Sequence, residues 1–249
     1  ISNYINDTVL HGRYVAYYKK NGRKMEEGEF ENGQKVGTWY QWYSNGDTLS
    51  VINFKNGPYK IWYEFEDNRI YSVKGQIKDG NRHGKWTEYH FNGKVKSVGY
   101  FKENIAVGEW KYYFADGTLK EHKNPAANLN LRYHQDGTIQ DSCGLKGENR
   151  HGKYIAFTKG GKLREVGYYR DDKKIGEWKS YWVNGQIKVH TFMENGMHNE
   201  YFISGKKKLS GEIKEGHREG VWNLYYRNEQ LAEQIIYING IKEGETVKH

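Results

Sequence analysis

The side chains in this sequence that could hold a metal ion are its ten histidines. His11, His83 and His151 each stand immediately before a glycine, at widely separated places in the chain. A metal site needs its ligands to converge on one point, as three or four side chains do around zinc. A ladder of single histidines does not converge in this way. We therefore expect no metal site.

The carboxylates and the single cysteine give no catalytic set either. The acidic pairs Glu26-Glu27 and Asp171-Asp172 are typical of exposed charge at strand edges and in loops, rather than of a general acid and base. Cys143 has no partner for an internal disulfide, and we interpret it as a small structural residue. The sequence contains no G-x-S-x-G, Walker loop, G-x-G-x-x-G, H-E-x-x-H or C-x-x-C motif. We expect no enzyme, no catalytic residue and no cofactor.

The elements that position these residues are copies of one unit, which is clearest in the stretch 84–108, GKWTEYHFNGKVKSVGYFKENIAVG. Asn92-Gly93, between two polar and aromatic runs, predicts a two-residue type I′ turn and therefore a β-hairpin. The expected cross-strand pairs are Phe91 with Lys94, Tyr89 with Lys96, Trp86 with Gly99, and Gly84 with Phe101. A ring opposite a glycine can lie over the bare backbone, so we expect Trp86 to cover Gly99.

The same pairing recurs along the chain, with Trp62 opposite Gly75, Tyr154 opposite Gly167 and Tyr14 opposite Gly28. The unit is written about ten times, mostly at a spacing of 24 residues and twice at a spacing of 20. The unit starts are Gly12, Gly37, Lys60, Gly84, Gly108, Asn128, Gly152, Gly176, Gly196 and Gly220. The pattern thus predicts a tandem array of hairpins rather than a compact globule.

Two columns of the aligned units are aromatic. The residues two places after each start form what we call the tryptophan column: Tyr14, Trp39, Trp62, Trp86, Trp110, Asn130, Tyr154, Trp178, His198 and Trp222. The residues five places after each start form the tyrosine column: Tyr17, Trp42, Phe65, Tyr89, Tyr113, Tyr133, Phe157, Tyr181, Tyr201 and Tyr225. Asn130 and His198 follow the two short repeats, where a deletion in either the loop or the strand would shift the alignment.

The next position, six places after each start, changes its chemistry from unit to unit and is called the variable column here. A variable stripe rich in aromatic residues suits partner recognition, because tyrosine and tryptophan supply contact area at low entropic cost. We predict a partner-binding stripe at Tyr18, Tyr43, His90, Phe114, Trp182, Phe202 and Tyr226. The alternative is that these are solvent-facing residues that simply favour strands.

These patterns predict an all-β fold: an elongated, single-layer antiparallel sheet of about ten tandem β-hairpins. Helix signals are nearly absent, and no apolar run approaches the length that spans a membrane. Residues 1–11 are interpreted as an N-terminal half-unit, 12–243 as the array and 244–249 as a C-terminal half-unit. The chain opens at Ile1, and an upstream leader that has been removed would favour the cell envelope or an extracytoplasmic location over the cytoplasm.

Two runs, DGNRHGKW at Asp79–Trp86 and KGENRHGKY at Lys146–Tyr154, resemble the MORN repeat. An aromatic residue, Trp86 or Tyr154, replaces the last glycine of that signature. The resulting form, G-x-W-x-x-Y-x-x-N-G, is similar to the bacterial MORN-variant repeat and covers essentially the whole chain. The resemblance implies a scaffold or interaction surface built of hairpins. Bacterial members are sometimes labelled antitoxin-like, and other MORN arrays are linked to anionic lipids.

We therefore predict a non-enzymatic repeat scaffold that mediates protein–protein interaction. The alternatives are a glycan or cell-wall binding module and an antitoxin-like protein that neutralises a partner. The formal net charge of +8 would ease peripheral contact with an anionic membrane. The lysines alternate along both strands instead of forming one stripe, so we do not expect nucleic acid as a partner. Self-association of the array is a further alternative.

Overall fold

The computed structural model describes residues 3–5, 9–63 and 70–248, and the chain divides into two compact units, Ile1–His122 and Lys123–His249. Unit 1 contains β1 (Asn3–Ile5), β2 (Val9–Tyr17), β3 (Lys24–Glu31), β4 (Gln34–Trp42), β5 (Thr48–Asn53), β6 (Gly57–Trp62), β7 (Tyr71–Lys78), β8 (Asn81–Tyr89), β9 (Val95–Lys102) and β10 (Ile105–Tyr113). Strand β11 (Leu119–Asn124) crosses from the first unit into the second.

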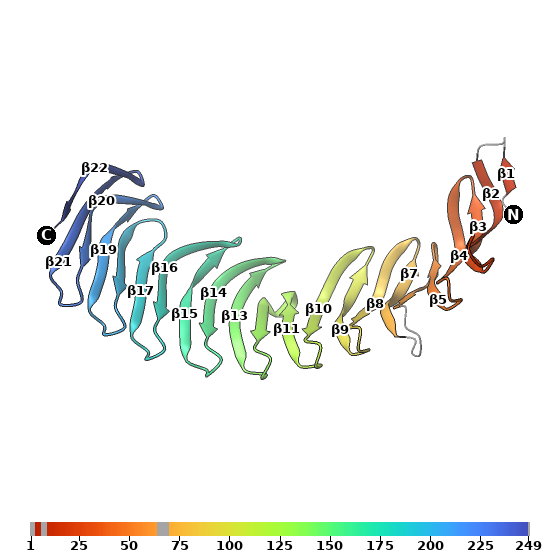
Figure 1. The fold of residues 1–249 in the computed structure, drawn as a ribbon, viewed down its shortest axis with the longest axis horizontal. Coiled ribbons are helices and arrows are strands. Elements are labelled where there is room, and N and C mark those ends of the chain that lie inside the picture. The colour runs from red at the N-terminus through yellow and green to blue at the C-terminus, as the bar shows by residue number, and fades with distance from the viewer. Residues whose placement is uncertain (1–2, 6–8, 64–69, 249) are drawn as a thin grey trace. The chain divides into compact units, whose positions relative to one another are not determined.

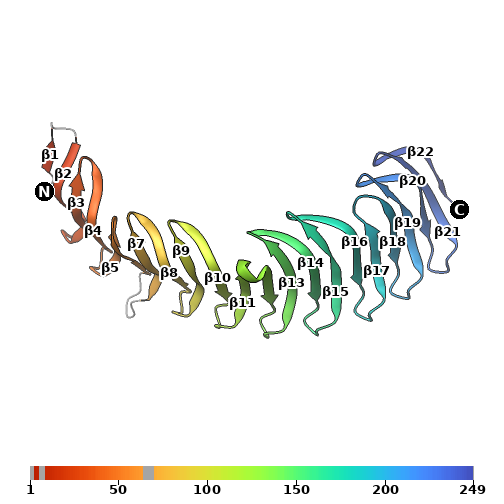
Figure 2. The ribbon, with the colours of Figure 1, turned by 180° about the vertical axis from the view of Figure 1, so that it is seen from behind.

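Unit 2 begins with a short 3₁₀ turn, η1 (Pro125–Ala127). It continues with β12 (Leu129–Tyr133), β13 (Ile139–Lys146), β14 (Asn149–Phe157), β15 (Leu163–Arg170), β16 (Lys173–Tyr181), β17 (Ile187–Phe192), β18 (Gly196–Tyr201), β19 (Lys207–Lys214), β20 (His217–Tyr225), β21 (Leu231–Ile238) and β22 (Ile241–Lys248). Within each unit the strands pair antiparallel in chain order and form one layer (Figures 1 and 2). The prediction of a single-layer antiparallel array of hairpins is confirmed.

Most hairpins close with a three-residue loop instead of the expected two-residue turn. At the end of β8 the His90 N–H donates to the Lys94 carbonyl at 2.8 Å, and the Gly93 N–H donates to the His90 carbonyl at 2.9 Å. Gly93 has a φ of +79°, whereas Asn92 does not adopt a positive φ. This is a type I turn followed by a left-handed residue, so the prediction of a type I′ turn at Asn92-Gly93 is wrong.

The loop changes the register only near the turn. Tyr89 pairs with Val95 and not with Lys96, and Phe91 lies in the loop and does not face Lys94. Farther from the turn the predicted pairs of Trp86 with Gly99 and of Gly84 with Phe101 are confirmed, as are those of Tyr14 with Gly28 and of Tyr154 with Gly167. Lys96 is the extra residue of a bulge, which restores the predicted pairing beyond it.

Type I′ turns do occur, but they lie between successive hairpins. Two consecutive residues have left-handed φ values at Asn32-Gly33, Asp79-Gly80, Glu103-Asn104, Asp171-Asp172, Glu215-Gly216 and Asn239-Gly240. The flanking residues pair directly, as Lys78 does with Asn81, which leaves a loop of two residues. Much of the array therefore alternates two turn types, one inside the hairpins and one between them.

The third unit begins at Gly57, so the predicted start at Lys60 is wrong. Tyr59, and not Trp62, pairs with Gly75 and belongs to the tryptophan column, whereas Trp62 pairs with Tyr71 and belongs to the tyrosine column. The reason is a longer connection, in which the Tyr63 N–H donates to the carbonyl of Ile70. Counting back from a turn at Asn68-Arg69 therefore shifted the alignment by three residues. That predicted turn, together with Phe65 and Glu66, lies outside the described residues.

The units that follow the two short repeats start at the predicted residues. His198 pairs with Gly211, the position that tryptophan holds in other units, and Asn130 pairs with Cys143. The His198 ring lies 5.3 Å from the Trp222 ring, measured between centroids. Both residues therefore belong to the tryptophan column.

The core is formed between hairpins, where a tryptophan lies on a glycine of the preceding hairpin at Trp39, Trp86, Trp110, Trp178 and Trp222. Strands β7 and β8 pair Lys74 with Thr87 and Gln76 with His83, which leaves Gly84–Trp86 opposite the single residue Gly75. A Cβ atom added to Gly75 would lie 2.3 Å from Cδ2 of Trp86. The expectation that Trp86 covers Gly99 is therefore wrong, because the ring on Gly99 is that of Trp110, at 2.1 Å from the same added atom.

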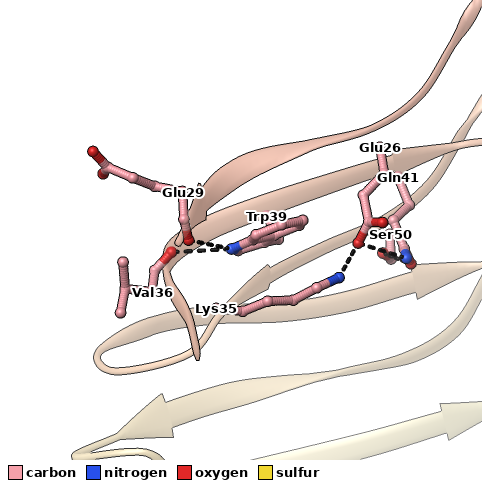
Figure 3. A network of polar contacts seen from close by, with 7 residues as sticks. All are labelled: Glu26, Glu29, Lys35, Val36, Trp39, Gln41 and Ser50. Carbon is pink, nitrogen blue, oxygen red and sulfur yellow. Dashed lines mark hydrogen bonds and ion pairs between the residues drawn. The ribbon is translucent and has the colours of Figure 1, made fainter. Parts of the chain in front are cut away.

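A polar network holds Trp39 in place, as Figure 3 shows. The indole Nε1 donates to the carbonyls of Glu29 and Val36, both at 3.1 Å. The Nζ of Lys35 lies 3.8 Å from the centroid of the Trp39 ring and pairs with the carboxylate of Glu26. Trp39 is only 2% exposed, so the ring is enclosed by backbone below and a cation above.

We expect Gly167→Ala to destabilise unit 2 by about 1–3 kcal/mol, because the added Cβ would lie 2.2 Å from Cδ2 of Trp178. Gly160→Ala is the matched control, since an added Cβ there meets only Thr158 Oγ1 at 4.0 Å. Urea unfolding with hydrogen exchange of β15 and β16 measures both effects. The double variant Gly167→Ala/Trp178→Ala should lose less stability than the sum of the single losses, and strict additivity would contradict the contact.

The burial of the His198 imidazole predicts that the folded chain loses stability in acid. Burial lowers the pKa of its imidazole, against a smaller opposing effect from Glu200, 3.5 Å from Nε2. The folded pKa therefore lies below the unfolded value of about 6.5, and the unfolded chain binds more protons as the pH falls through that value. The free energy of unfolding should drop below about pH 6.5, and His198→Gln should remove part of that drop. Equal pH profiles for His198→Gln and the exposed control His217→Gln would refute this.

Candidate interaction surfaces

Each unit offers two sheet faces, because successive residues of a strand point to opposite sides. We call the side that carries the tryptophan column the tryptophan face, and the side that carries the tyrosine column the tyrosine face. Most tryptophan rings of this column are buried, as Trp178 at 3% and Trp222 at 1% exposure, whereas Trp110 is half-buried. The tyrosine column is mostly half-buried, so its rings retain accessible surface.

The variable column lies at the turn end of each hairpin and reaches the next hairpin. Its polar side-chain atoms bond to the backbone carbonyl of the tyrosine-column residue one hairpin further on. The bonds are Tyr18 Oη to the Trp42 carbonyl at 2.8 Å, Tyr43 Oη to Trp62 at 2.8 Å, His90 Nε2 to Tyr113 at 3.0 Å and Trp182 Nε1 to Tyr201 at 3.1 Å. Four residues of the predicted stripe thus join consecutive hairpins.

The other three members have different surroundings. Phe114 and Phe202 carry no hydrogen-bonding atom, and the cations of Lys120 and Arg227 each lie 5.8 Å from the centre of one ring. Tyr226, in the last complete hairpin, is 53% exposed. The stripe therefore combines links between hairpins with accessible ring surface, and its contact with a partner stays a prediction.

Sequence reasoning missed one member of the variable column, Tyr63. Its hydroxyl donates to the Tyr89 carbonyl at 2.9 Å, and its ring stacks on Phe91 with the centroids 4.1 Å apart. The misplaced start of the third unit assigned this position to Glu66. The signal that would have found it is the Trp62-Tyr63 dipeptide, which repeats Trp42-Tyr43.

Two predicted stripe residues of unit 2 line a hollow of 510 Å³. Trp182 and Phe202 contribute rings, and Ile203, which is 53% exposed, adds an aliphatic side chain. Four cationic residues lie around them: Lys188, Lys206, Lys208 and Arg227. We call this site the aromatic hollow. Glu200 also lines it and pairs with Lys208 at 3.1 Å, so the hollow offers apolar contact surface inside a rim with more cations than carboxylates.

The carboxylates and the cysteine that were considered for catalysis make ion pairs or are buried in the sheet. Glu27 pairs with Arg13 at 2.6 Å and with Lys24 at 2.7 Å, and the hydrogen bonds from these cations lower the pKa of the Glu27 carboxyl. Asp172 lies in the turn between β15 and β16 and pairs with Arg150 of β14 at 2.9 Å. Cys143 is buried, and its burial raises the pKa of the thiol.

The histidines singled out by the sequence stand in separate strands, His11 in β2, His83 in β8 and His151 in β14. Over residues 3–5, 9–63 and 70–248 the structure brings together no three His, Cys, Asp or Glu side chains that could hold a metal ion. In the same ranges no helix has the length and apolarity needed to cross a membrane.

Five segments match the family model described as MORN repeat variant: residues 35–56, 82–103, 106–124, 174–195 and 218–239. The segment 82–103 takes in most of β8 and all of β9, so one match corresponds to one hairpin. This chain contains MORN-variant repeats. The hairpins β2–β3 and β14–β15 lie outside the matched segments and have the same aromatic–glycine pairing as the matched segment 82–103.

The remaining comparisons add little to the MORN-variant assignment. The comparison with curated proteins gives no match. Among solved structures, a crystal structure of TcdB2-TccC3-Cdc42 is 12% identical and covers 92% of this chain and 14% of that chain, with a TM-score of 0.16. At that TM-score the likeness carries no argument about fold or function.

The hydrogen bonds between hairpins that the variable column makes predict that Tyr18→Phe lowers the stability of the array. The change removes the hydroxyl bond to the Trp42 carbonyl and should lower the free energy of unfolding by about 0.5–1.5 kcal/mol. Tyr226→Phe is the matched control, since Tyr226 is exposed and the structure gives its hydroxyl no acceptor among the described residues. Urea unfolding compares the two variants, and equal losses would show that the hydroxyl bond does not stabilise the array.

Proposed function

We propose that the chain is a non-enzymatic scaffold that binds another protein, with the aromatic hollow of unit 2 as its docking centre. The observation that supports this most directly is the combination of Trp182 and Phe202 with the exposed Ile203 in a single hollow. Protein interfaces concentrate their binding energy in a few aromatic and aliphatic anchors of this kind. An exposed apolar group bordered by polar residues is a common sign of a contact site.

Charge indicates the nature of the partner. The hollow carries Lys188 and Arg227 on its rim, and the chain as a whole has a formal net charge of +8. A partner with an apolar anchor flanked by carboxylates would complement this surface, and such complementarity raises the rate of association. The proposed partner is therefore an acidic protein.

The repeat architecture supports a scaffold more than a catalyst. The buried tryptophans, the paired carboxylates and the links of the variable column all hold successive hairpins together, as in the network around Trp39. What varies between repeats is the accessible surface, and solenoid proteins use such extended surfaces for binding.

The test is capture of a partner followed by reconstitution. The purified chain is used as bait in lysate and envelope fractions of the source organism, and each captured protein is purified and titrated against the bait by calorimetry. Phe202→Ala/Ile203→Ala should weaken binding at least tenfold, about 1.4 kcal/mol, because it removes two anchors of the hollow. Neither side chain makes a hydrogen bond, so the fold should be retained.

Phe91→Ala is the matched control, since Phe91 also sits in a hairpin loop and is 68% exposed, but in unit 1. It should leave the affinity within about twofold of the native value. Equal weakening by both variants would reject the aromatic hollow as the docking centre. Capture of glycan or lipid without protein would reject the scaffold proposal itself.

A further inference from the structure

Three lysines come together on the tyrosine face of unit 1. Lys60 in β6 pairs directly with Lys74 in β7, and Lys85 lies in the neighbouring strand β8. Together they line a hollow of 920 Å³, which we call the lysine hollow. Like charges directly opposite one another destabilise a sheet, so this arrangement opposes folding. A hydrogen bond to Tyr89 raises the pKa of Lys74, which keeps its ammonium charged.

Other repeats place carboxylates beside cations in the equivalent columns. Arg13 pairs with Glu27 at 2.6 Å, Lys111 lies 3.8 Å from Glu109, and the Nζ of Lys179 lies 2.8 Å from Glu177.

The lysine hollow differs from these sites, because no carboxylate lines it within the part of the chain that the structure describes. The ammonium groups of Lys60, Lys74 and Lys85 also lie in no ion pair with a described residue, whereas a fourth lining lysine, Lys94, donates to the Asp116 carbonyl at 2.5 Å. A carboxylate supplied by another molecule would offset their repulsion.

The donors of the hollow favour carboxylates over phosphate. The backbone N–H groups of its turns are already used, since Gly93 donates to His90 and Gly117 donates to Phe114, both at 2.9 Å. Arginine, with its bidentate fork, is missing from the described lining residues. Phosphate sites usually combine free N–H groups or arginine forks. The lysine hollow offers single ammonium charges on flexible stems, and these can each meet one carboxylate.

The shape suits an extended chain. The hollow crosses neighbouring strands, and Tyr89 and Tyr113 of the tyrosine column line its floor. In an extended peptide, alternate side chains project to one side at intervals of about 6.6 Å, so acidic residues at every second position would meet successive lysines. Tyrosine rings add contact area at low entropic cost.

We propose that the lysine hollow binds an acidic, extended peptide segment of a partner protein. The proposal deepens the scaffold function, because it names a class of partner sequence. It rests on residues of unit 1, however, and its test requires neither the aromatic hollow nor an identified partner. A failed capture experiment would therefore refute the scaffold proposal, and a failed peptide titration would refute peptide binding by the lysine hollow.

The test is calorimetric titration of the full chain with a synthetic peptide of alternating glutamate and serine. The native chain should bind it, and the same peptide with glutamine in place of glutamate should not bind. Lys60→Gln/Lys74→Gln/Lys85→Gln should weaken binding by at least about tenfold. These changes also remove the repulsion between Lys60 and Lys74, so thermal melting of unit 1 should not fall.

The matched control is Lys55→Gln/Lys78→Gln/Lys102→Gln. It removes the same charge from exposed lysines of unit 1 outside the lysine hollow. This variant should change the affinity by less than about twofold. Equal losses in the two triple variants would show that only net charge matters and would overturn the proposal.

Two further probes separate the sources of negative charge. Tripolyphosphate and phosphatidylcholine vesicles containing phosphatidylserine are titrated against the native chain and the Lys60/Lys74/Lys85 variant. Binding of either probe in the absence of peptide binding, with loss in that variant, would overturn the peptide assignment. Weak binding of a probe that is equal for the native chain and the lysine variant would be non-specific. In that case binding of the peptide by the native chain would support the proposal.

The sequence also carries Glu64, Glu66 and Asp67, in a segment that lies outside the described residues. The titration is therefore repeated in the background Glu64→Gln/Glu66→Gln/Asp67→Asn. The lysine variant should again lose at least about tenfold in affinity there. If the loss vanishes in this background, the effect of the lysines depends on the chain's own carboxylates and the proposal is overturned.

Discussion

The structure depends on a tryptophan ring that lies directly on a glycine of the preceding hairpin. In the pair of Trp86 with Gly75, no side chain larger than hydrogen fits at the glycine, and the ring takes the space of the missing Cβ. A two-stranded hairpin is at best marginally stable alone in water. The ring therefore supplies what the hairpin lacks, a buried apolar contact that only the next hairpin can provide. Folding of one repeat is coupled in this way to folding of its neighbour.

The two kinds of turn follow from this requirement. Gly84 adopts a left-handed φ of +70° at the bulge that brings Trp86 over Gly75. A short type I′ turn such as Asp79-Gly80 precedes the bulge and fixes its register, because a two-residue loop allows no slip. The loop inside the hairpin differs in length in the first and third repeats. The connections between hairpins vary too, since those from β5 to β6 and from β17 to β18 have three residues and no type I′ turn.

These constraints explain which features could be predicted from the sequence. The pairing of Trp86 with Gly99 follows from spacing alone and is correct, but the same spacing is compatible with a ring lying on either neighbour. The choice of Gly75 depends on the bulge, whose residue signal is a left-handed glycine that recurs at Gly84, Gly108 and Gly176. The Asn-Gly pair was misassigned for a related reason. Asn92 is favoured for its side chain, which bonds the Lys94 N–H and the Ala115 carbonyl at 3.1 and 2.6 Å, and not for a positive φ.

The candidate sites were harder to predict, because the variable column also holds hairpins together. A hydroxyl such as that of Tyr18 can vary to histidine or tryptophan and still reach a carbonyl, so variation alone does not identify a binding residue. Departures from the packing rules are more informative. Lys60 opposite Lys74 has no structural benefit, and sequences usually break such local rules only where function requires it. Other like-charge pairs occur, as between Arg170 and Lys173, but the pair of Lys60 with Lys74 also lines a hollow without a described carboxylate, and this combination supports the proposed peptide site.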